Sequence, residues 1–321
     1  MKQVNWGVLS TANIGKNVVI PAMLSADNCN LYAIGSRNID RARQFQKDFA
    51  FEKAYGSYEE LLEDDEIQAI YIPLPNKLHG EWIKKAAKSG KHILCEKPIV
   101  GTKKELIEVL QVCKENKIIL MEAFAYLHNP IIEDIKETLK KGEIGEISFI
   151  EATFLTPRPK EDNIRLNKEL LGGALYDLGC YPISLVLHLL EEEPINVKGI
   201  ANFTDSGIDD YANIYLEFAN NIRANLLCGM CSGQRGDRFY IYGTKGTIEA
   251  PIPFNADGDL SYYIVKDKER LERKMRVKNN YQLEIEQMGR CIINGESPWV
   301  SNEFSLLNAK VIDKALEAIK Y

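Results

Sequence analysis

The chain has 321 residues, more than one hydrophobic core usually supports, so two domains are expected. Its 45 % hydrophobic and 27 % charged residues are typical of an ordinary globular protein. The net charge of −6 argues against nucleic acid or an anionic membrane as the main partner. No apolar run approaches the ~18 residues of a membrane span, and the first residues lead directly into a strand, so no signal peptide is expected.

The 7 cysteines are scattered through apolar segments, as reduced thiols of a cytoplasmic protein usually are. Cys228 and Cys231 form a C-x-x-C pair in a strand-like run, but no second pair accompanies it. We therefore predict a cytoplasmic protein without a metal site.

A β run at residues 4–9 is followed by a helical pattern in which apolar residues recur at 14, 18 and 22. The turn between them reads Ser10-Thr11-Ala12-Asn13-Ile14-Gly15. Compared with the dinucleotide fingerprint G-x-G-x-x-G, it has Ser10 and Ala12 at the first two glycine positions and keeps Gly15, where the helix must pack close to the strand. Small residues still let the backbone approach a pyrophosphate at a helix N-terminus, so the turn predicts a dinucleotide site.

A second strand at 31–34 runs into Gly35-Ser36-Arg37, where an NAD site normally offers Asp or Glu to the ribose hydroxyls. A guanidinium suits a 2′-phosphate through its charge and fork geometry. Ser36 and Arg37 therefore predict NADP as the cofactor, with NAD possible. The alternative is an exposed arginine that only begins the helix at 39–49.

The fourth strand, at 69–72, leaves at Pro73-Leu74-Pro75-Asn76, and a helix follows from 77 to 89. His79 lies near the start of that helix. We predict that Pro73, Leu74, Asn76 and His79 contribute to the cofactor site. A purely structural or solvent-exposed histidine is the alternative.

The next strand, 91–95, starts after Gly90 and ends in Glu96-Lys97-Pro98. Ligands of open α/β sheets bind at the carboxyl ends of the strands, so Lys97 can project into such a site. Pro98 restricts the backbone of Lys97 to extended geometry. The alternative is a surface Glu–Lys pair that ends a strand.

The segment Thr102-x-x-Glu105 is a capping box that opens another helix, and a sixth strand covers 118–122. Strands alternating with helices up to this point predict a doubly wound parallel sheet, a Rossmann domain at 1–124. The β runs between 147 and 265 are joined by short turns such as Asn220-Asn221 and predict a large, mostly antiparallel open sheet. The second domain, 125–321, is therefore predicted to be an α+β domain.

Another candidate site lies in the run Leu171-Gly172-Gly173-Ala174-Leu175-Tyr176-Asp177-Leu178-Gly179-Cys180-Tyr181-Pro182. The two glycines allow a ligand to approach the backbone closely. The apolar pattern from 174 to 188 is helical, so Asp177 and Tyr181 at i, i+4 share a face. They are a candidate proton-handling pair, and the alternative is a core helix whose tyrosine is capped by its own aspartate.

With these motifs in hand, the chain resembles the Gfo/Idh/MocA family of nicotinamide-dependent sugar oxidoreductases over essentially its whole length. Glu96-Lys97-Pro98 matches the E-K-P motif of the family, and Asp177-x-x-x-Tyr181 matches its D-x-x-x-H/Y motif. Pro75-Asn76 with His79, and Glu122 with Pro130, are similar to residues of the family. The stretch GGALYDLGCY looks most like the branch of dihydrodiol dehydrogenases and NADP-dependent D-xylose dehydrogenases. Ser10 and Ala12 depart from the family's glycines, which affects the expected cofactor affinity.

The resemblance implies hydride transfer between NADP(H) and a sugar, polyol or related compound, with Lys97, Asp177 and Tyr181 as catalytic residues. A phenol both donates and accepts protons, and the charge of Lys97 would lower the pKa of that phenol. Which of Lys97 and Tyr181 is the formal acid/base stays open. The resemblance also implies a homodimer or larger homo-oligomer. The alternative functions are a non-catalytic NADP-binding regulator and an NAD-dependent glycosidase of the same fold.

Overall fold

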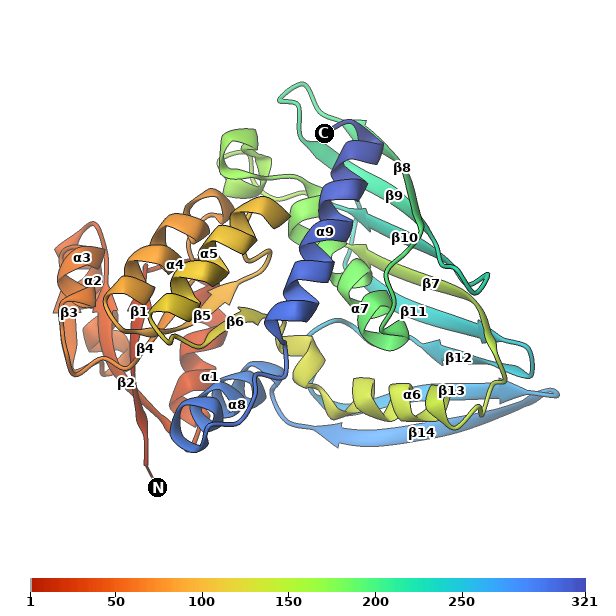
Figure 1. Ribbon diagram of the computed structural model, residues 1–321, viewed down its shortest axis with the longest axis horizontal. Coiled ribbons are helices and arrows are strands. Elements are labelled where there is room, and N and C mark those ends of the chain that lie inside the picture. Colours follow the sequence, from red (N-terminus) through yellow and green to blue (C-terminus); the bar gives the residue numbers. More distant parts are fainter. Residues whose placement is uncertain (1) are drawn as a thin grey trace. The chain divides into compact units, whose positions relative to one another are not determined.

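The computed structural model describes residues 2–321, and the chain forms two compact units (Figure 1). The first unit contains the chain up to His128 together with Asn279–Leu306, and the second contains Asn129–Lys278 and Leu307–Tyr321. The predicted division at 124/125 placed the whole C-terminal part in the second domain. The structure instead returns residues 279–306 to the first unit.

The first unit is built on a six-stranded parallel sheet in the order β3-β2-β1-β4-β5-β6. This is the strand order of a dinucleotide-binding Rossmann fold, and the predicted parallel sheet is confirmed. The order reverses between β1 and β4, so the carboxyl ends of these two strands mark the place where such folds bind ligands. The strands are β1 (Val4–Leu9), β2 (Cys29–Gly35), β3 (Lys53–Tyr55), β4 (Ala69–Ile72), β5 (His92–Glu96) and β6 (Leu120–Ala123).

Several helices of the first unit begin at a polar side-chain cap. The Asn38 side chain accepts from the backbone N–H groups of Asp40 and Arg41 at the start of α2. The Thr102 hydroxyl accepts from the Glu105 N–H at 3.2 Å, as the capping box predicted. The elements are η1 (Gly15–Val19), α1 (Ile20–Ser25), α2 (Ile39–Phe49), α3 (Tyr58–Leu62), η2 (Asn76–Leu78), α4 (His79–Lys88), α5 (Lys103–Glu115), η3 (Ala125–His128) and α8 (Asn280–Asn294).

Helix α8 joins the first unit because both its apolar and its polar groups find partners there. Ile285 and Met288 are fully buried. The Gln282 amide donates to the Ser25 carbonyl at 2.8 Å, and the Asn28 amide donates to the Glu286 carbonyl at 2.8 Å. These bonds tie residues some 258 positions apart in sequence, a distance that local patterns do not reveal.

The second unit contains an eight-stranded sheet in the order β14-β13-β12-β11-β7-β10-β9-β8. Its neighbours pair antiparallel except for β10 and β7, which pair parallel, so the predicted mostly antiparallel sheet is confirmed. The strands are β7 (Ile147–Leu155), β8 (Asn196–Phe203), β9 (Asp209–Glu217), β10 (Arg223–Gly229), β11 (Gly236–Gly243), β12 (Gly246–Ala250), β13 (Gly258–Lys266) and β14 (Glu269–Val277).

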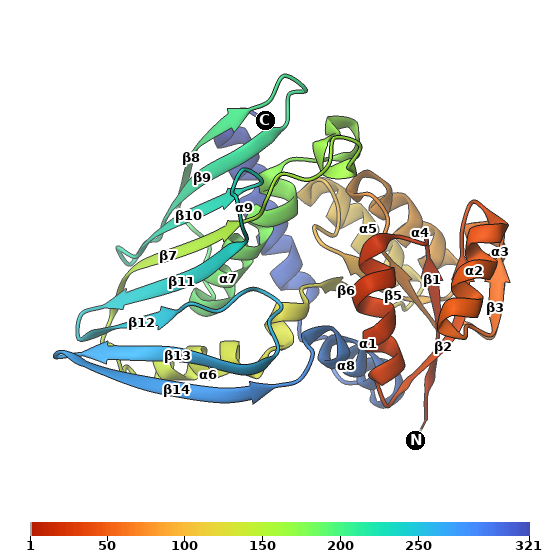
Figure 2. The ribbon, with the colours of Figure 1, turned by 180° about the vertical axis from the view of Figure 1, so that it is seen from behind.

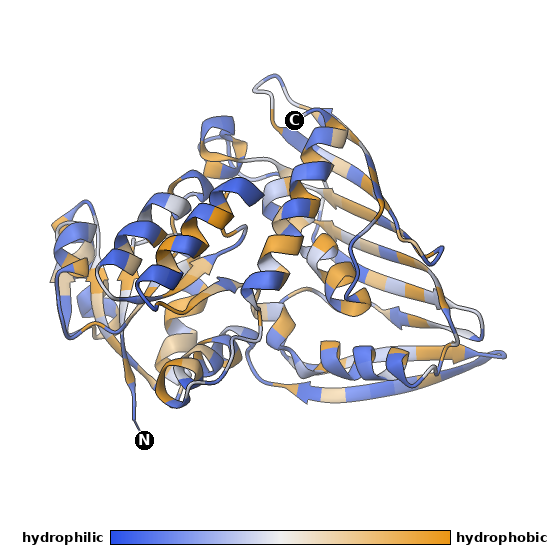
Figure 3. Ribbon diagram, viewed as in Figure 1, coloured by the Kyte–Doolittle hydropathy of each residue, from blue (hydrophilic) through white to orange (hydrophobic). Residues whose placement is uncertain are grey.

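Helices cover one face of this sheet, and Figure 2 shows the opposite face in front of them. They are α6 (Pro130–Lys140), α7 (Cys180–Leu190) and the part of α9 (Asn302–Ile319) that belongs to the second unit. Figure 3 shows α7 as largely hydrophobic. The helical stretch Lys168–Leu190 is long and apolar enough to cross a membrane, but 83 % of its most apolar window is buried inside the protein, as in the core helix of a globular fold. Short turns of helix precede α7: η4 (Ile164–Leu166), η5 (Lys168–Leu170) and η6 (Leu175–Gly179).

Candidate active site

The turn after β1 takes the shape that a dinucleotide fingerprint requires, although serine replaces its first glycine. Ser10 has a φ of 119°, in the region that favours glycine, and its N–H donates to the Gly35 carbonyl at 3.0 Å. The helix that follows contains a π turn at η1, a feature often found at functional sites. A Cβ on Gly15 would lie 3.8 Å from Cδ1 of Ile20 and farther from Pro73 and Tyr71, so the packing of the helix against the strand does not require a glycine here.

The end of β2 presents the residues predicted to select NADP. Ser36 is buried, and its hydroxyl accepts from the Asn38 N–H at 3.2 Å, while Arg37 is exposed. A second guanidinium belongs to this corner: Arg41 donates through Nη2 to the Thr11 carbonyl at 3.5 Å. Sequence analysis missed Arg41, although its position one helical turn after Arg37 is a signal that could have been used.

His79 joins two loops at the carboxyl ends of the strands. Its Nδ1 lies 2.9 Å from the Pro98 carbonyl, and its Nε2 lies 2.8 Å from the Leu74 carbonyl. Burial lowers the pKa of His79, and the nearby charge of Lys97 lowers it further, so the neutral imidazole is favoured. In that form one ring nitrogen donates to a carbonyl. Both ring nitrogens thus face backbone, and the histidine holds the loop after β4 against the loop after β5.

The Glu96-Lys97-Pro98 segment begins at the last residue of β5, and the Lys97–Pro98 peptide bond is cis. The Tyr71 hydroxyl donates to Oε1 of Glu96 at 2.6 Å, which fixes one side of this carboxylate. On the neighbouring strand β6, Glu122 accepts from the Ile99 N–H at 3.0 Å. Burial raises the pKa of Glu122 to about 7, while contacts to Ser305 and Ile99 and the charge of Lys97 act in the lowering direction.

Helix α8 adds a second buried acid near Glu96 that the sequence did not reveal. Glu284 is 1 % exposed. Its pKa is raised well above the usual range, first by burial and then by the charge of Glu96. Burial, followed by the charge of Glu96, also raises the pKa of Tyr71, so the phenol stays protonated and donates to Glu96. No local motif marks Glu284, because its environment is created by the return of the chain to the first unit.

In the second unit, Asp177 and Tyr181 lie on the predicted helical run, but a π turn at η6 occupies its start. Nε of Arg165 pairs with Oδ2 of Asp177 at 2.6 Å. Asp209 anchors the beginning of this run, since its Oδ2 accepts from the Leu175 N–H at 2.7 Å. Burial raises the pKa of Asp209 to about 7 despite this bond. Arg165 and Asp209 were not predicted, because each approaches the run from outside it.

Tyr181 is 7 % exposed and belongs to an aromatic cluster with Phe154 and Phe254. Its ring centroid lies 5.1 Å from that of Phe154 and 5.2 Å from that of Phe254, and the two phenylalanines stack at 5.2 Å. The Asn255 amide donates to the Tyr181 hydroxyl at 3.3 Å. An apolar wall with a phenol at its centre can pack against the carbon face of a substrate and exchange a proton with it.

Two family models match the chain over most of its length. Residues 4–124 match the oxidoreductase family with an NAD-binding Rossmann fold, and residues 132–249 match the GFO/IDH/MocA C-terminal domain. The chain belongs to the GFO/IDH/MocA family of oxidoreductases. This confirms the family resemblance that the motifs Glu96-Lys97-Pro98 and Asp177-x-x-x-Tyr181 indicated.

Members of the family with described activities align with almost the whole chain. The D-xylose 1-dehydrogenase (NADP(+)) 2 of Haloferax volcanii is 33 % identical, with 98 % of this chain and 96 % of the relative covered. A trans-1,2-dihydrobenzene-1,2-diol dehydrogenase of Xenopus laevis is 31 % identical, with 98 % and 97 % covered. The structure of KijD10, a 3-ketoreductase from Actinomadura kijaniata in complex with NADP and TDP-benzene, matches with a TM-score of 0.94 and 28 % identity, covering 99 % of this chain and 98 % of KijD10.

These findings confirm the predicted fold, the predicted branch of relatives and an NAD(P)-dependent oxidoreductase as the class of enzyme. They also confirm the predicted cofactor, since the xylose dehydrogenase uses NADP and the KijD10 structure contains it. The roles of Lys97, Asp177 and Tyr181 stay predictions. Within residues 2–321 no group of three or more His, Cys, Asp or Glu side chains is placed to hold a metal ion.

Proposed function

We propose that this protein transfers a hydride between NADP(H) and a sugar, polyol or related hydroxy or carbonyl compound. The observation that carries the proposal is the combination of an NAD-binding Rossmann unit, with a lysine directly after β5, and a phenol set in an aromatic wall of the second unit. Relatives that act on D-xylose or on a dihydrodiol support the substrate class.

The residues of the first unit fit the cofactor. Ser10 adopts the positive φ that the glycine of the fingerprint would have, and small side chains leave room for a pyrophosphate at the turn. The exposed guanidinium of Arg37, with Arg41 beside Thr11, suits the charge of a 2′-phosphate. The residues proposed to bind NADP(H) are Ser10, Thr11, Ala12, Asn13, Ile14, Ser36, Arg37, Pro73, Leu74, Asn76, Glu96 and Lys97. His79 would contribute to the cofactor site indirectly, by holding the backbone of Leu74 and Pro98.

When bound, the nicotinamide supplies or accepts the hydride at C4. In the oxidation direction, Tyr181 removes the proton of the substrate hydroxyl while the hydride leaves the carbon that bears this hydroxyl. Lys97 holds the substrate oxygen and stabilises its negative charge. Asp177, steadied by Arg165, orients the substrate. Proton and hydride together account for the two hydrogens that turn an alcohol into a carbonyl.

Cofactor choice can be tested on two residues. Exchanging Ser36 for Asp and Arg37 for Ala removes the Arg37 cation and adds a carboxylate that accepts hydrogen bonds from the ribose hydroxyls. The preference of the double variant should move from NADP toward NAD, mainly through KM. Equal kcat/KM values for NADP and NAD in the unmutated protein would contradict the assignment.

The decisive experiment is a panel of aldoses, inositols and diols with NADP⁺ and NAD⁺, monitored at the nicotinamide absorbance. Net reduction of the cofactor identifies an oxidoreductase, whereas a regulator or an NAD-dependent glycosidase gives no net change. With an active substrate, Lys97→Met should lower kcat by about 10²-fold or more while NADP(H) still binds. Normal turnover of Lys97→Met would leave the lysine with a structural role only.

We further propose a cytoplasmic homodimer or larger homo-oligomer that uses the face of the eight-stranded sheet opposite its helices. Along β7, Ile150 and Ala152 are fully buried, whereas Phe149 on the other face is half-buried and lies 6.0 Å from Tyr242. Partly exposed aromatic side chains on a broad sheet suit a second copy of the chain. Sedimentation of the protein and of Tyr242→Glu tests this, and a monomeric unmutated protein would exclude it.

A further inference from the structure

The loop between β12 and β13 carries Asn255 against the phenol of Tyr181. Asn255 has a φ of 60°, a left-handed conformation that asparagine adopts more readily than most residues. Its Nδ2 lies 3.3 Å from the Tyr181 hydroxyl oxygen. The loop ends just before β13, and no motif of the sequence analysis includes it.

Both sides of this loop are fixed by polar contacts within the second unit. The Phe254 N–H donates to Oδ2 of Asp237 at 2.9 Å, and Arg235 donates to the Phe254 carbonyl at 2.7 Å. On the far side, the amide of the buried Asn129 donates to the Ala256 carbonyl at 3.3 Å. Asn255 therefore stands on a short segment whose backbone is held immediately before and after it.

The clamp that holds Phe254 is itself an ion pair. Arg235 pairs with Asp237 at 2.6 Å, and the Asp237 side chain is completely buried. The Arg235 guanidinium also lies 5.0 Å from the Phe154 ring centroid, which belongs to the wall around Tyr181. A buried carboxylate with these donors keeps the loop in place more firmly than van der Waals packing alone.

We propose that Asn255 is a positioning residue for the reaction, because its amide donates to the Tyr181 oxygen and thereby favours the ionised form of the phenol. This inference rests on the proposed proton-handling role of Tyr181. The Asn255 amide stabilises the phenolate that forms when Tyr181 acts as an acid. Its hydrogen bond is weaker when the phenol oxygen is neutral.

The other charged groups near this phenol occur mainly as pairs. Asp177, on the same helical run, pairs with Arg165. Asp237 of β11 pairs with Arg235, which precedes that strand. From β10, the thiol of Cys228 packs near Gly179 and is kept protonated because burial raises its pKa. Asn255 is a neutral residue, and its amide contacts the phenol oxygen directly.

The test replaces Asn255 by Gly, which deletes the amide and tolerates the left-handed backbone. The matched control is Asn221→Gly, since Asn221 also has a left-handed φ, of 65°, but lies in the turn between β9 and β10. Tyrosines are labelled with ¹³C in the ring, and the Tyr181 resonance is assigned as the one missing from Tyr181→Phe. Its pKa is then followed by NMR in the full-length protein saturated with NADP⁺.

Loss of a donor to the phenolate should raise the Tyr181 pKa by roughly one unit, and Asn221→Gly should leave it unchanged. Asn255→Asp, which keeps the shape of the side chain but replaces the donor by a carboxylate, should raise it further. The thermal midpoint of Asn255→Gly, measured in parallel, should stay within a few degrees of the unmutated protein. An unchanged or lowered pKa in Asn255→Gly would overturn the inference.

Turnover separates this inference from the proposed function. With a substrate from the panel, Tyr181→Phe should lose most of its activity, and Asn255→Gly should lower kcat about tenfold with KM nearly unchanged. The pH limb of kcat/KM should move with the NMR pKa. If Tyr181→Phe keeps its full rate, the proton role of the tyrosine fails and this inference fails with it. If only Asn255→Gly keeps both its rate and its pH limb, the role of Asn255 alone is refuted.

Discussion

Replacing Ser10 by Gly should stabilise the first unit, because serine holds a backbone conformation there that glycine adopts freely. A residue in such a region stores about 1–3 kcal/mol of strain. Glycine adds conformational entropy to the unfolded chain, which costs about 0.5–1 kcal/mol. The hydrogen bond from Ser10 to Gly35 uses the backbone N–H, so the substitution keeps it. The expected net gain is therefore about 0.5–2 kcal/mol in the free energy of unfolding.

The gain can be measured as a shift in Tm, at about 2–4 °C for each kcal/mol in a unit of this size. Two other substitutions by glycine serve as controls for Ser10→Gly. Ala50→Gly changes a residue with a φ of 57°, so it should also stabilise. Ala12→Gly changes a neighbouring residue outside the left-handed region and should lower Tm. A Ser10→Gly variant that is destabilised like Ala12→Gly would show that the backbone at Ser10 is not strained.

Three further outcomes are expected. Gly173→Ala should lower Tm by several degrees, since Gly173 has a φ of 107° and a Cβ there would collide with the buried Asp209. Calorimetry should show no such loss for Gly233→Ala, because Gly233 is exposed and has open space around it. Thr102→Ala should cost about 1 kcal/mol in denaturant unfolding through loss of the helix cap, and Thr102→Ser should restore most of it. The Glu122 pKa of about 7 lies above the usual 4.5, so its contribution to stability is complete below pH 4.5 and is lost as pH rises to about 7. Glu122→Gln should therefore gain stability relative to the unmutated protein between pH 5 and 7.5, by up to about 3 kcal/mol, and an equal difference at both pH values would contradict the assignment.

Patterns in the sequence predicted the elements whose stability is local. The alternation of buried strands and amphipathic helices predicted β1, α2 and β4 with their observed bounds. Strand β14 was missed because its sequence, ERLERKMRV, has neither the alternation nor the apolar content of a typical strand. Its backbone pairs with β13 along its whole length, and that pairing supplies what the side chains do not.

The candidate site divides in the same way. Lys97, Asp177 and Tyr181 stand in short motifs, so the sequence could point to them. Asn255 and Glu284 act on residues more than 70 positions away along the chain, and only the fold brings them there. The aspartate–tyrosine spacing was taken as a simple helical i, i+4 pair, whereas the π turn at η6 changes the geometry before Tyr181.

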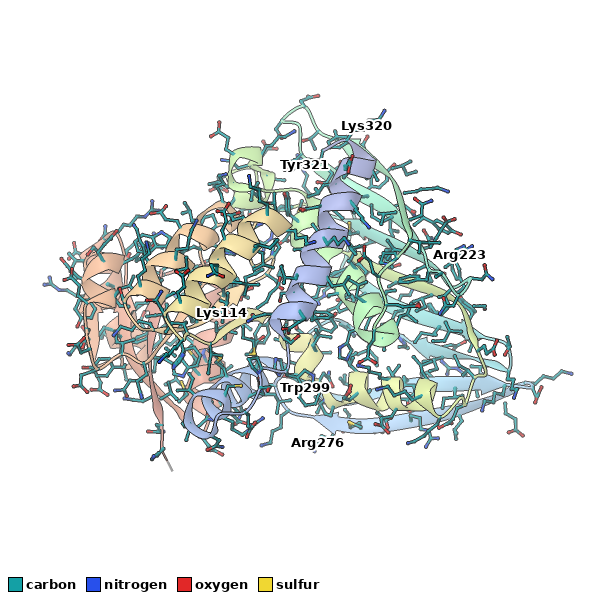
Figure 4. The ribbon with its side chains drawn as sticks, in the orientation of Figure 1. Lys114, Arg223, Arg276, Trp299, Lys320 and Tyr321 are labelled. Atoms are coloured by element: carbon teal, nitrogen blue, oxygen red, sulfur yellow. The ribbon has the colours of Figure 1, made fainter. Side chains whose placement is uncertain are left out.

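The late return of residues 279–306 to the first unit has a consequence for synthesis on the ribosome. The N-terminal segment emerges first, but the buried partners that α8 brings to it, such as Met288, are among the last to be made. Until then the apolar surface that α8 covers is open to solvent and to chaperones. Figure 4 labels Trp299 and Tyr321, which stand at the two ends of the final stretch of chain. The Rossmann unit can complete its fold only after the segment up to Trp299, which contains α8, has been synthesised. A nascent chain arrested at residue 128 should therefore remain sensitive to protease, whereas the released protein should resist it.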